Sequence, residues 1–320
     1  MKTTEAFGNQ TAKAARPRVK SLALAAALIS TQALGLAACG GDEAPGGDAG
    51  GDQSAQSQKI IVGSADFPES QLLATIYAQA LTGAGFEAST KLSIGSREVY
   101  IPALLDGSIN LLPEYTGATL SYLEASAGVS SPEDVAAKLA EVLPEGVTML
   151  TPSDAQDSDV LAVAPETAEK YGLKTIEDLA PHAGELALGG PPEWETRHEG
   201  LVGLKEVYGL EFKEFTALDA GGPLTIAALA NGQVGAADLF STLPAMADFV
   251  ALEDNKNLFP AQNIVPIAAD AIVTDKLVEV LDAVSAALTT ADLIEMNARL
   301  DAQESIDDVA ADWLAANGLG

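Results

Sequence analysis

The stretch KIIVGSADFPESQLLATIYAQAL, residues 59–81, decides the fold that we predict. Residues 59–63 form a short β-type run, and the apolar side chains from Leu72 to Ala80 recur at helical spacing. Two glycines, Gly83 and Gly85, then end the predicted helix. A strand that runs through a short turn into a helix is the basic unit of an α/β fold.

The same alternation of strands and helices continues to the C-terminus. Further extended stretches are predicted at 86–94, 109–112, 160–164, 185–188, 235–240 and 264–268. Further helices are predicted at 97–105, 116–127, 133–143, 176–179, 201–208, 224–230, 276–288, 291–300 and 306–316. We interpret this pattern as an α/β protein with parallel sheets, in which about 260 residues suffice for one large domain or two lobes.

The N-terminal segment before this folded part has the pattern of a lipoprotein signal. Four Lys and Arg side chains between positions 13 and 20 precede the uncharged run 21–38, which ends in Leu-Ala-Ala before Cys39. The last four residues fit a lipobox, in which the cysteine is lipidated and becomes the mature N-terminus. A transmembrane anchor is the alternative, although about 18 residues are borderline for a span. We therefore predict a signal peptide at 1–38 and an extracytoplasmic protein held on the cell membrane by lipid on Cys39.

The segment that follows, GGDEAPGGDAGGDQSAQSQ at 40–58, contains no large apolar side chain. Such a composition cannot bury a core and is typical of a solvated linker. We therefore predict a flexible tether at 39–58.

The chain is strongly acidic, with a formal net charge of −29. Residues 1–38 carry five basic side chains and one acidic side chain, so that removing their charge of +4 leaves −33. A surface of this sign repels nucleic acid and anionic lipid headgroups, which both require Lys and Arg clusters. We interpret the acidity as an aid to solubility rather than as attraction of a cation. The single cysteine also excludes an intramolecular disulfide.

Motifs of the common enzyme classes are absent from the sequence. It has no G-x-S-x-G, no G-x-G-x-x-G and no P-loop, and its one thiol is committed to lipid. His182 and His198 do not have metal-ligand spacing, and we interpret both as surface or loop residues. We therefore expect no enzyme activity, no catalytic residue, no metal and no cofactor. A lipoprotein hydrolase with two catalytic carboxylates stays open as an alternative, although no motif singles out such a pair.

Three turns are candidates for contact with a ligand: 63–70, 112–117 and 238–242. Each joins the end of a strand to a following segment, and each places an aromatic residue beside small hydroxyl residues. Open α/β sheets bind ligands just beyond the carboxyl ends of their strands.

Around these turns the chain resembles a known family, the substrate-binding proteins of osmoprotectant ABC importers of the glycine betaine, choline and carnitine type. The matching segments are GSADFPESQLLATIYAQAL at 63–81, GSREVYIPAL at 95–104, LLPEYTGATLSYL at 111–123, LAVAPETAEKYGLKTIEDL at 161–179, PEWETRHEGLVGLKEVYGLEF at 192–212 and ALANGQVGAADLFST at 228–242. The resemblance implies an α/β, two-lobed periplasmic-binding-protein fold of type II, a clamshell with two hinge crossovers. On that model lobe I is 59–156 plus 259–320, and lobe II is 157–258.

The resemblance also implies a function. It implies a lipoprotein that captures a small osmoprotectant, such as glycine betaine or choline, between its lobes and delivers it to the transmembrane permease subunit. We expect the protein to be a monomer. The alternative within the same transport role is a different zwitterionic or amino-acid-like ligand.

Several positions carry over from the aromatic cage of this family, and others depart from it. Tyr115 matches a cage tyrosine, whereas Phe240 stands where the family has another tyrosine. Ser70 replaces a common glutamine, and Ala118 replaces a polar residue that often tunes the choice of ligand. Phe67 is a further candidate because it lies in the first of the three turns.

The remaining candidates change the polarity of the predicted site. Asp159 stands at a position that is usually aromatic, and Gln262 and Asn263 stand where the family often has tyrosine. Trp194 and Arg197 lie in a family-like segment, and the arginine fork suits a ligand carboxylate. The site predicted in this way has fewer rings and more hydrogen-bonding groups than a full aromatic cage.

Overall fold

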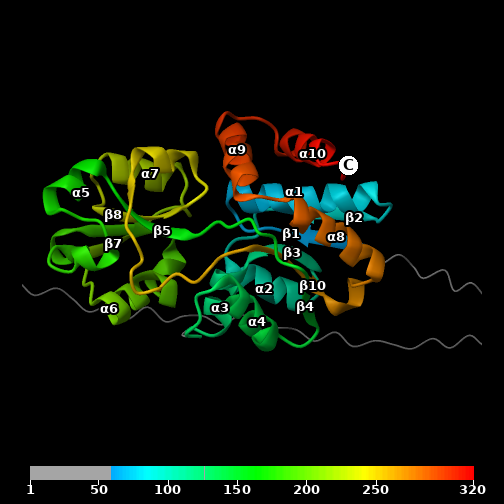
Figure 1. The fold of residues 1–320 in the computed structure, drawn as a ribbon, viewed down its shortest axis with the longest axis horizontal. Coiled ribbons are helices and arrows are strands. Elements are labelled where there is room, and N and C mark those ends of the chain that lie inside the picture. The colour runs from blue at the N-terminus through cyan, green and yellow to red at the C-terminus, as the bar shows by residue number, and fades with distance from the viewer. Residues whose placement is uncertain (1–58, 126) are drawn as a thin grey trace, which may run out of the picture. The chain divides into compact units, whose positions relative to one another are not determined.

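The structure is a computed structural model that describes residues 59–125 and 127–320. The predicted signal peptide, the lipid site at Cys39 and the tether up to residue 58 lie outside the described residues. Two five-stranded sheets organise the described part, which has the mixed α/β, two-lobed architecture that the sequence predicted (Figure 1). Within the described part, no helix is long and apolar enough to cross a membrane.

The first sheet has the strand order β2-β1-β3-β10-β4. Its strands are β1 (Ile60–Gly63), β2 (Ala88–Lys91), β3 (Leu111–Tyr115), β4 (Val147–Met149) and β10 (Ile264–Ala269). The helices around it are α1 (Pro68–Gly83), α2 (Arg97–Leu105), α3 (Thr116–Leu123), α4 (Pro132–Val142), α8 (Asp275–Ala287), α9 (Thr290–Asp301) and α10 (Ile306–Ala316), with a short turn of helix at Asp270–Ile272.

The second sheet has the order β7-β6-β8-β5-β9. Its strands are β5 (Asp159–Val163), β6 (Ala187–Gly190), β7 (Glu214–Ala217), β8 (Ala236–Phe240) and β9 (Val250–Ala251). Its helices are α5 (Pro165–Tyr171), α6 (Gly203–Tyr208) and α7 (Pro223–Ala230), with short helical turns at Ile176–Leu179, Ala183–Glu185, Pro192–Glu195, His198–Val202 and Pro244–Asp248.

The prediction of parallel sheets was wrong in part. β1 pairs in parallel with β2 and β3, and β6 pairs in parallel with β7 and β8, but β10 and β5 are antiparallel to all their neighbours. A helical crossover within one sheet returns the chain in the same direction and so imposes parallel pairing. The chain reaches β5 and β10 from the other sheet instead, so that this constraint does not act on them.

The two segments that connect the sheets run side by side. One joins β4 to β5 and the other joins β9 to β10. They meet at an antiparallel bridge between Gln156 and Asn263, and the amide of Asp157 donates a hydrogen bond of 3.2 Å to the carbonyl of Gln262. Lobe boundaries at 156/157 and 258/259 stay a prediction.

Helix α1 is the centre of the core of the first sheet. It contacts β1 and β3 on one side and α8 and α10 on the other, and most of its side chains are buried, as expected for a helix enclosed on both sides (Figure 1). It begins at Pro68, whose fixed φ favours the first helical position. This start places Glu69 and Ser70 in the first turn of the helix, at the carboxyl end of β1.

Candidate functional site

A cavity of about 570 Å³, counted with its opening to solvent, lies between the two sheets. Sheet ends, the first turn before α1, the start of α2 and the connecting segments all contribute to its wall. Of the ten candidates from the sequence, eight line it: Phe67, Tyr115, Ala118, Asp159, Trp194, Arg197, Phe240 and Gln262. Cavities between lobes are the usual place for small ligands.

Three rings gather on one side of this cavity. The Phe67 ring centroid lies 5.9 Å from that of Tyr115 and 5.2 Å from that of Phe240. Tyr115 ends β3 of the first sheet and Phe240 ends β8 of the second sheet, so the three rings connect the two sheets. Trp194 is only 1% exposed and stacks on Phe259 at 6.1 Å, which places most of its ring in the core of the second sheet.

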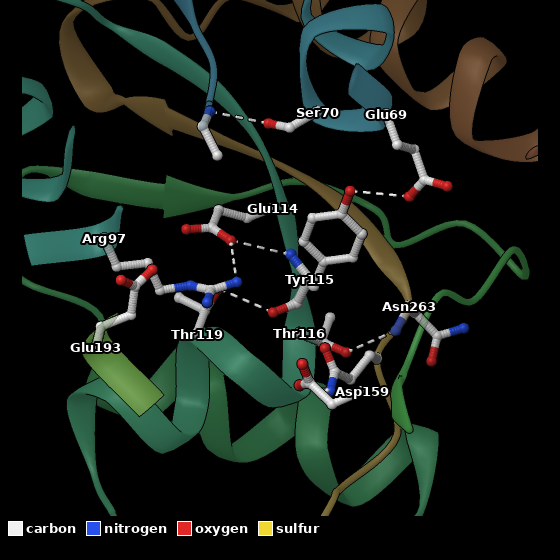
Figure 2. A network of polar contacts seen from close by, with 12 residues as sticks. Glu69, Ser70, Arg97, Glu114, Tyr115, Thr116, Thr119, Asp159, Glu193 and Asn263 are labelled. Carbon is white, nitrogen blue, oxygen red and sulfur yellow. Dashed lines mark hydrogen bonds and ion pairs between the residues drawn. The ribbon is translucent and has the colours of Figure 1, made fainter. Parts of the chain in front are cut away.

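Tyr115 is held by a buried carboxylate. Its hydroxyl donates a hydrogen bond of 2.9 Å to Oε1 of Glu69 (Figure 2). Oε2 of Glu69 accepts bonds of 2.6 Å from Thr242 Oγ1 and 2.6 Å from Asn297 Nδ2. Burial, and then the charge of Glu69, raise the pKa of the Tyr115 phenol well above its usual range. Because Thr242 follows β8, Glu69 links the two sheets directly behind the Tyr115 ring.

A second carboxylate, Asp157, lies beside this link. Its Oδ1 accepts a bond of 3.0 Å from the amide of Thr242 and one of 3.0 Å from the hydroxyl of Ser241. Burial, and then the neighbouring Glu69, raise the pKa of Asp157 well above its usual range. The sequence did not single out Glu69 or Asp157, because neither lies in a recognisable catalytic or metal motif.

Arg97 lines the cavity and forms a buried ion pair. Its Nη2 lies 2.9 Å from Oε2 of Glu114, which is fully buried and also accepts a bond of 3.1 Å from the amide of Tyr115 (Figure 2). Burial alone would lower the pKa of Arg97, but the carboxylate of Glu114 outweighs it and raises that pKa. Nε of Arg97 has no hydrogen-bond partner among the described residues. The sequence offered one signal for Arg97, since the segment 95–104 carries part of the resemblance.

Arg197 is engaged by a carboxylate of the protein itself. Its Nη2 and Nε lie 2.9 Å and 3.1 Å from the two carboxylate oxygens of Glu98, at the start of α2. Burial alone would raise the pKa of Glu98, but the bond from Arg197 lowers it to about 2. The guanidinium therefore joins the second-sheet side of the cavity to α2, and two of its donors are already used before any ligand arrives.

Acidic side chains lie beside these rings in the lining of the cavity. Oδ2 of Asp159 accepts a bond of 2.7 Å from Nε2 of Gln262. Asp238, near the end of β8, also lines the cavity, is 1% exposed, and has no hydrogen-bond partner for either carboxylate oxygen among the described residues. Burial, and then the charge of Asp159, raise the pKa of Asp238 well above its usual range. An acid within the otherwise apolar strand GAADLF is the signal that points to Asp238.

Two candidates from the sequence lie outside the lining of the cavity. Oγ of Ser70 accepts a bond of 2.9 Å from the amide of Ala65 and thereby holds the turn before α1. Asn263 does not line the cavity either. Its backbone amide donates a hydrogen bond of 3.0 Å to Thr116 Oγ1, and its side-chain Nδ2 donates one of 2.9 Å to the Ser153 carbonyl. Figure 2 shows the bond at the Ser70 hydroxyl and the bond between the Asn263 amide and Thr116.

The cavity as a whole suits a small positively charged group. The ring faces and the carboxylates in the lining both attract a cation. Among the described residues, no group of three or more His, Cys, Asp or Glu side chains has the arrangement of a metal site.

Comparisons with known proteins agree with this geometry. Residues 58–316 match the family model OpuAC, described as the substrate binding domain of ABC-type glycine betaine transport system. A glycine-betaine-binding protein from Pseudomonas aeruginosa is 28% identical over 284 residues, covering 83% of this chain and 90% of that protein. The carnitine transport binding protein OpuCC from Listeria monocytogenes is 27% identical over 268 residues, covering 81% of this chain and 82% of that protein.

A solved structure shares the fold. The crystal structure of a glycine betaine/carnitine/choline ABC transporter superposes with a TM-score of 0.64 at 22% identity, covering 82% of this chain and 99% of that one. The family match extends over nearly all of the described residues and includes every segment that lines the cavity. The chain belongs to the family of substrate-binding domains of ABC-type glycine betaine transport systems.

Proposed function

We propose that this protein is the extracytoplasmic receptor of an ABC importer and captures a small osmoprotectant of the glycine betaine or choline type between its two sheets. The membership of the chain in its family and the binding proteins to which it is similar support the transport role. The observation that carries the choice of ligand is the cluster of Phe67, Tyr115 and Phe240, which lines one cavity together with the carboxylate of Asp159, the cross-strand neighbour of Phe240.

Physical chemistry supports this choice. A desolvated cation over an aromatic face gains roughly 0.5–2 kcal/mol for each ring. The quaternary ammonium of glycine betaine or choline has a diffuse charge and an apolar surface, which suit ring faces better than hydrogen-bonding groups. A carboxylate such as Asp159 adds Coulomb attraction in a site from which water is largely excluded.

Closure of the two sheets around the ligand supplies the signal to the permease in this proposal. The bond between Glu69 and Thr242 joins the sheets in the present arrangement. A ligand that contacts Tyr115 and Phe240 at once shifts the protein toward the form in which the sheets are close. The permease subunit then distinguishes the loaded receptor from the empty one.

The N-terminal segment completes the proposal. Lipid on Cys39 would hold the receptor on the membrane, and the tether at 39–58 would keep it within reach of its permease at a high effective concentration. A Cys39→Ser variant should therefore lose lipid labelling and leave the membrane fraction of cells. Retention of the variant in that fraction would contradict lipidation at Cys39.

The deciding experiment is titration calorimetry of the purified protein with glycine betaine, choline, carnitine and proline betaine. We expect at least one of them to bind, and we expect Tyr115→Ala to weaken that binding by at least about 1 kcal/mol, roughly fivefold. Tyr171→Ala is the matched control, since that ring stacks on His182 at 4.2 Å, away from the cavity. The absence of binding by all four compounds would refute the quaternary-amine ligand. Mass spectrometry of compounds released from the purified protein tests the alternative of another zwitterion.

A further inference from the structure

The carboxylate of Asp238 can accept hydrogen bonds that a quaternary ammonium, which has no N–H, does not donate. It lines the cavity, is 1% exposed, and neither of its oxygens has a hydrogen-bond partner in the described part of the chain. A buried acceptor without a donor loses the hydrogen bonds that water would supply, and this loss is larger for a charged group. Native structures hold few such groups, so each one calls for an explanation.

Asp159 lies next to Asp238 on the neighbouring strand. Asp159 pairs with Phe240, and Asp238 pairs with Leu161, in the antiparallel ladder of β5 and β8. The two aspartates are therefore diagonal neighbours on one face of the sheet, close enough to interact. Gln262 supplies a neutral donor to Asp159 at 2.7 Å.

The cations near the cavity are already paired. Arg97 is bound to Glu114 at 2.9 Å, and Arg197 is bound to Glu98 at 2.9 Å. Two more acids, Asp157 and Glu199, the latter 3% exposed, act on Asp238, and neither supplies a positive charge. Arg97 and Arg197 line the same cavity but are bound to other acids, and the two carboxylate oxygens of Asp238 have no hydrogen-bond donor among the described residues.

We propose, building on the function proposed above, that Asp159 and Asp238 together receive N–H donors from the ligand, so that the preferred ligand is a cation that keeps at least one N–H. Protonated tertiary or secondary amines and guanidinium groups belong to this class. A fully alkylated ammonium neutralises the charge of the pair but offers no donor to its oxygens. A partly methylated amine satisfies the carboxylates with its N–H and still presents methyl groups to the rings of Phe67, Tyr115 and Phe240.

In the absence of ligand, both aspartates hold a proton more readily than a free carboxylate does. Burial, and then the charge of Asp159, raise the pKa of Asp238, and burial also raises the pKa of Asp159 against the bond from Gln262 and the charges of Arg97 and Arg197. The N–H of an arriving cation takes the place of this proton. Binding should therefore release protons into the buffer.

Three ligands that differ only in methylation test the proposal by titration calorimetry: glycine betaine with no N–H, N,N-dimethylglycine with one and sarcosine with two. We expect dimethylglycine to bind the full protein at least about tenfold tighter than glycine betaine, which is the lower end of the contribution of one hydrogen bond to a charged group. Asp238→Asn should reduce this preference to less than about twofold, because the neutral amide keeps the shape but loses the charge and one acceptor. Asp254→Asn is the matched control, since that carboxylate bonds the Phe259 amide at 2.7 Å, away from the cavity.

A second measurement needs no variant. Titration of dimethylglycine in buffers of different ionisation enthalpy, repeated across a series of pH values, should show release of protons on binding. Glycine betaine binding as tightly as dimethylglycine, or a preference that persists in Asp238→Asn, would overturn the inference and leave the proposed function standing. Failure of all three ligands, together with choline and carnitine, would remove the proposed function and the inference with it.

Discussion

The ion pair between Arg97 and Glu114 offers the sharpest test of how the cavity wall is held. Its two atoms lie 2.9 Å apart, the side chain of Arg97 is 10% exposed and that of Glu114 is fully buried. We compare two single variants, Arg97→Met and Glu114→Gln, each of which removes one partner and keeps the approximate size of the side chain. The two variants should differ strongly, because the charge that each leaves behind has a different environment.

Arg97→Met leaves the carboxylate of Glu114 without a cation, since Arg97 is its only salt-bridge partner in the part of the chain that the structure describes. Breaking a buried pair in this way typically costs about 3–5 kcal/mol. Glu114→Gln instead leaves Arg97, and the charges of Glu199 and Asp159 act on the same guanidinium. The second variant should therefore lose only about 1.5–3 kcal/mol, the value of one hydrogen bond to a charged group.

Urea denaturation followed by circular dichroism measures both losses, and thermal unfolding gives a second readout. For a folded part of this size, about 2–4 °C of midpoint shift corresponds to each kcal/mol, so Arg97→Met should lower the midpoint by roughly 6–20 °C. Arg299→Met is the control, because its pairs with Glu304 and Asp312 are exposed, and it should leave the midpoint almost unchanged. A loss for Glu114→Gln that equals or exceeds that of Arg97→Met would refute the reasoning.

Three further changes test other parts of the structure. Burial, and then the charge of Asp159, raise the pKa of Glu199 from 4.5 to about 7, so the folded form holds a proton that the unfolded chain releases. The free energy of unfolding should then fall by up to about 3 kcal/mol as pH rises from 4.5 to 7. Urea titrations at pH 5 and pH 8 measure this, and a difference in the free energy of unfolding between wild type and Glu199→Gln that is the same at both pH values would contradict it. Tyr115→Phe keeps the ring but loses the 2.9 Å bond to Glu69. This variant should lower the free energy of unfolding by about 1.5–3 kcal/mol and retain most of the ligand affinity. Equal losses of affinity for Tyr115→Phe and Tyr115→Ala in calorimetry would assign the hydroxyl, not the ring, to binding. Gly117→Ala would place a Cβ 2.6 Å from a backbone oxygen of the connecting segment and should lower the free energy of unfolding in urea by about 1–3 kcal/mol. Gly83→Ala, whose Cβ would have its nearest atom at 3.5 Å, should not destabilise the protein. Similar unfolding midpoints for the two variants would show that the connecting segment moves to make room.

Much of the fold was predictable because its elements follow from local patterns. The apolar spacing after Pro68 predicted α1, and the β-type run before it predicted β1. Short elements escaped the same reasoning. Helix α5 has only seven residues and β7 only four, too few for a period to stand out. The helix expected at 116–127 ends at Leu123. The prediction was too long because the sequence has no strong stop residue before Gly128.

The candidate site was predictable only where one residue carries a recognisable role alone. Tyr115 and Phe240 were found because each is an aromatic residue at the end of a strand. Arg197 was expected to face a ligand carboxylate, but it meets Glu98, which is 99 positions away in the sequence. Such a pair depends on how two distant segments meet, and a single sequence contains no periodic signal for it. Asp238 was overlooked for the same reason, since its lack of a partner is visible only in three dimensions.

The rings and the link between the sheets form one network, which bears on any measured affinity. Tyr115 bonds Glu69, and Glu69 bonds Thr242 beyond the end of β8, where Phe240 also stands. A ligand that contacts both Tyr115 and Phe240 therefore binds well only when the sheets are as close as this bond requires. The free energy of forming the link is then part of the binding free energy, and the observed affinity falls with the fraction of molecules in which the link is open. Thr242→Val, which touches no ring, should thus weaken every ligand by the same factor, whereas changes at the aspartate pair should alter the order of preference among ligands.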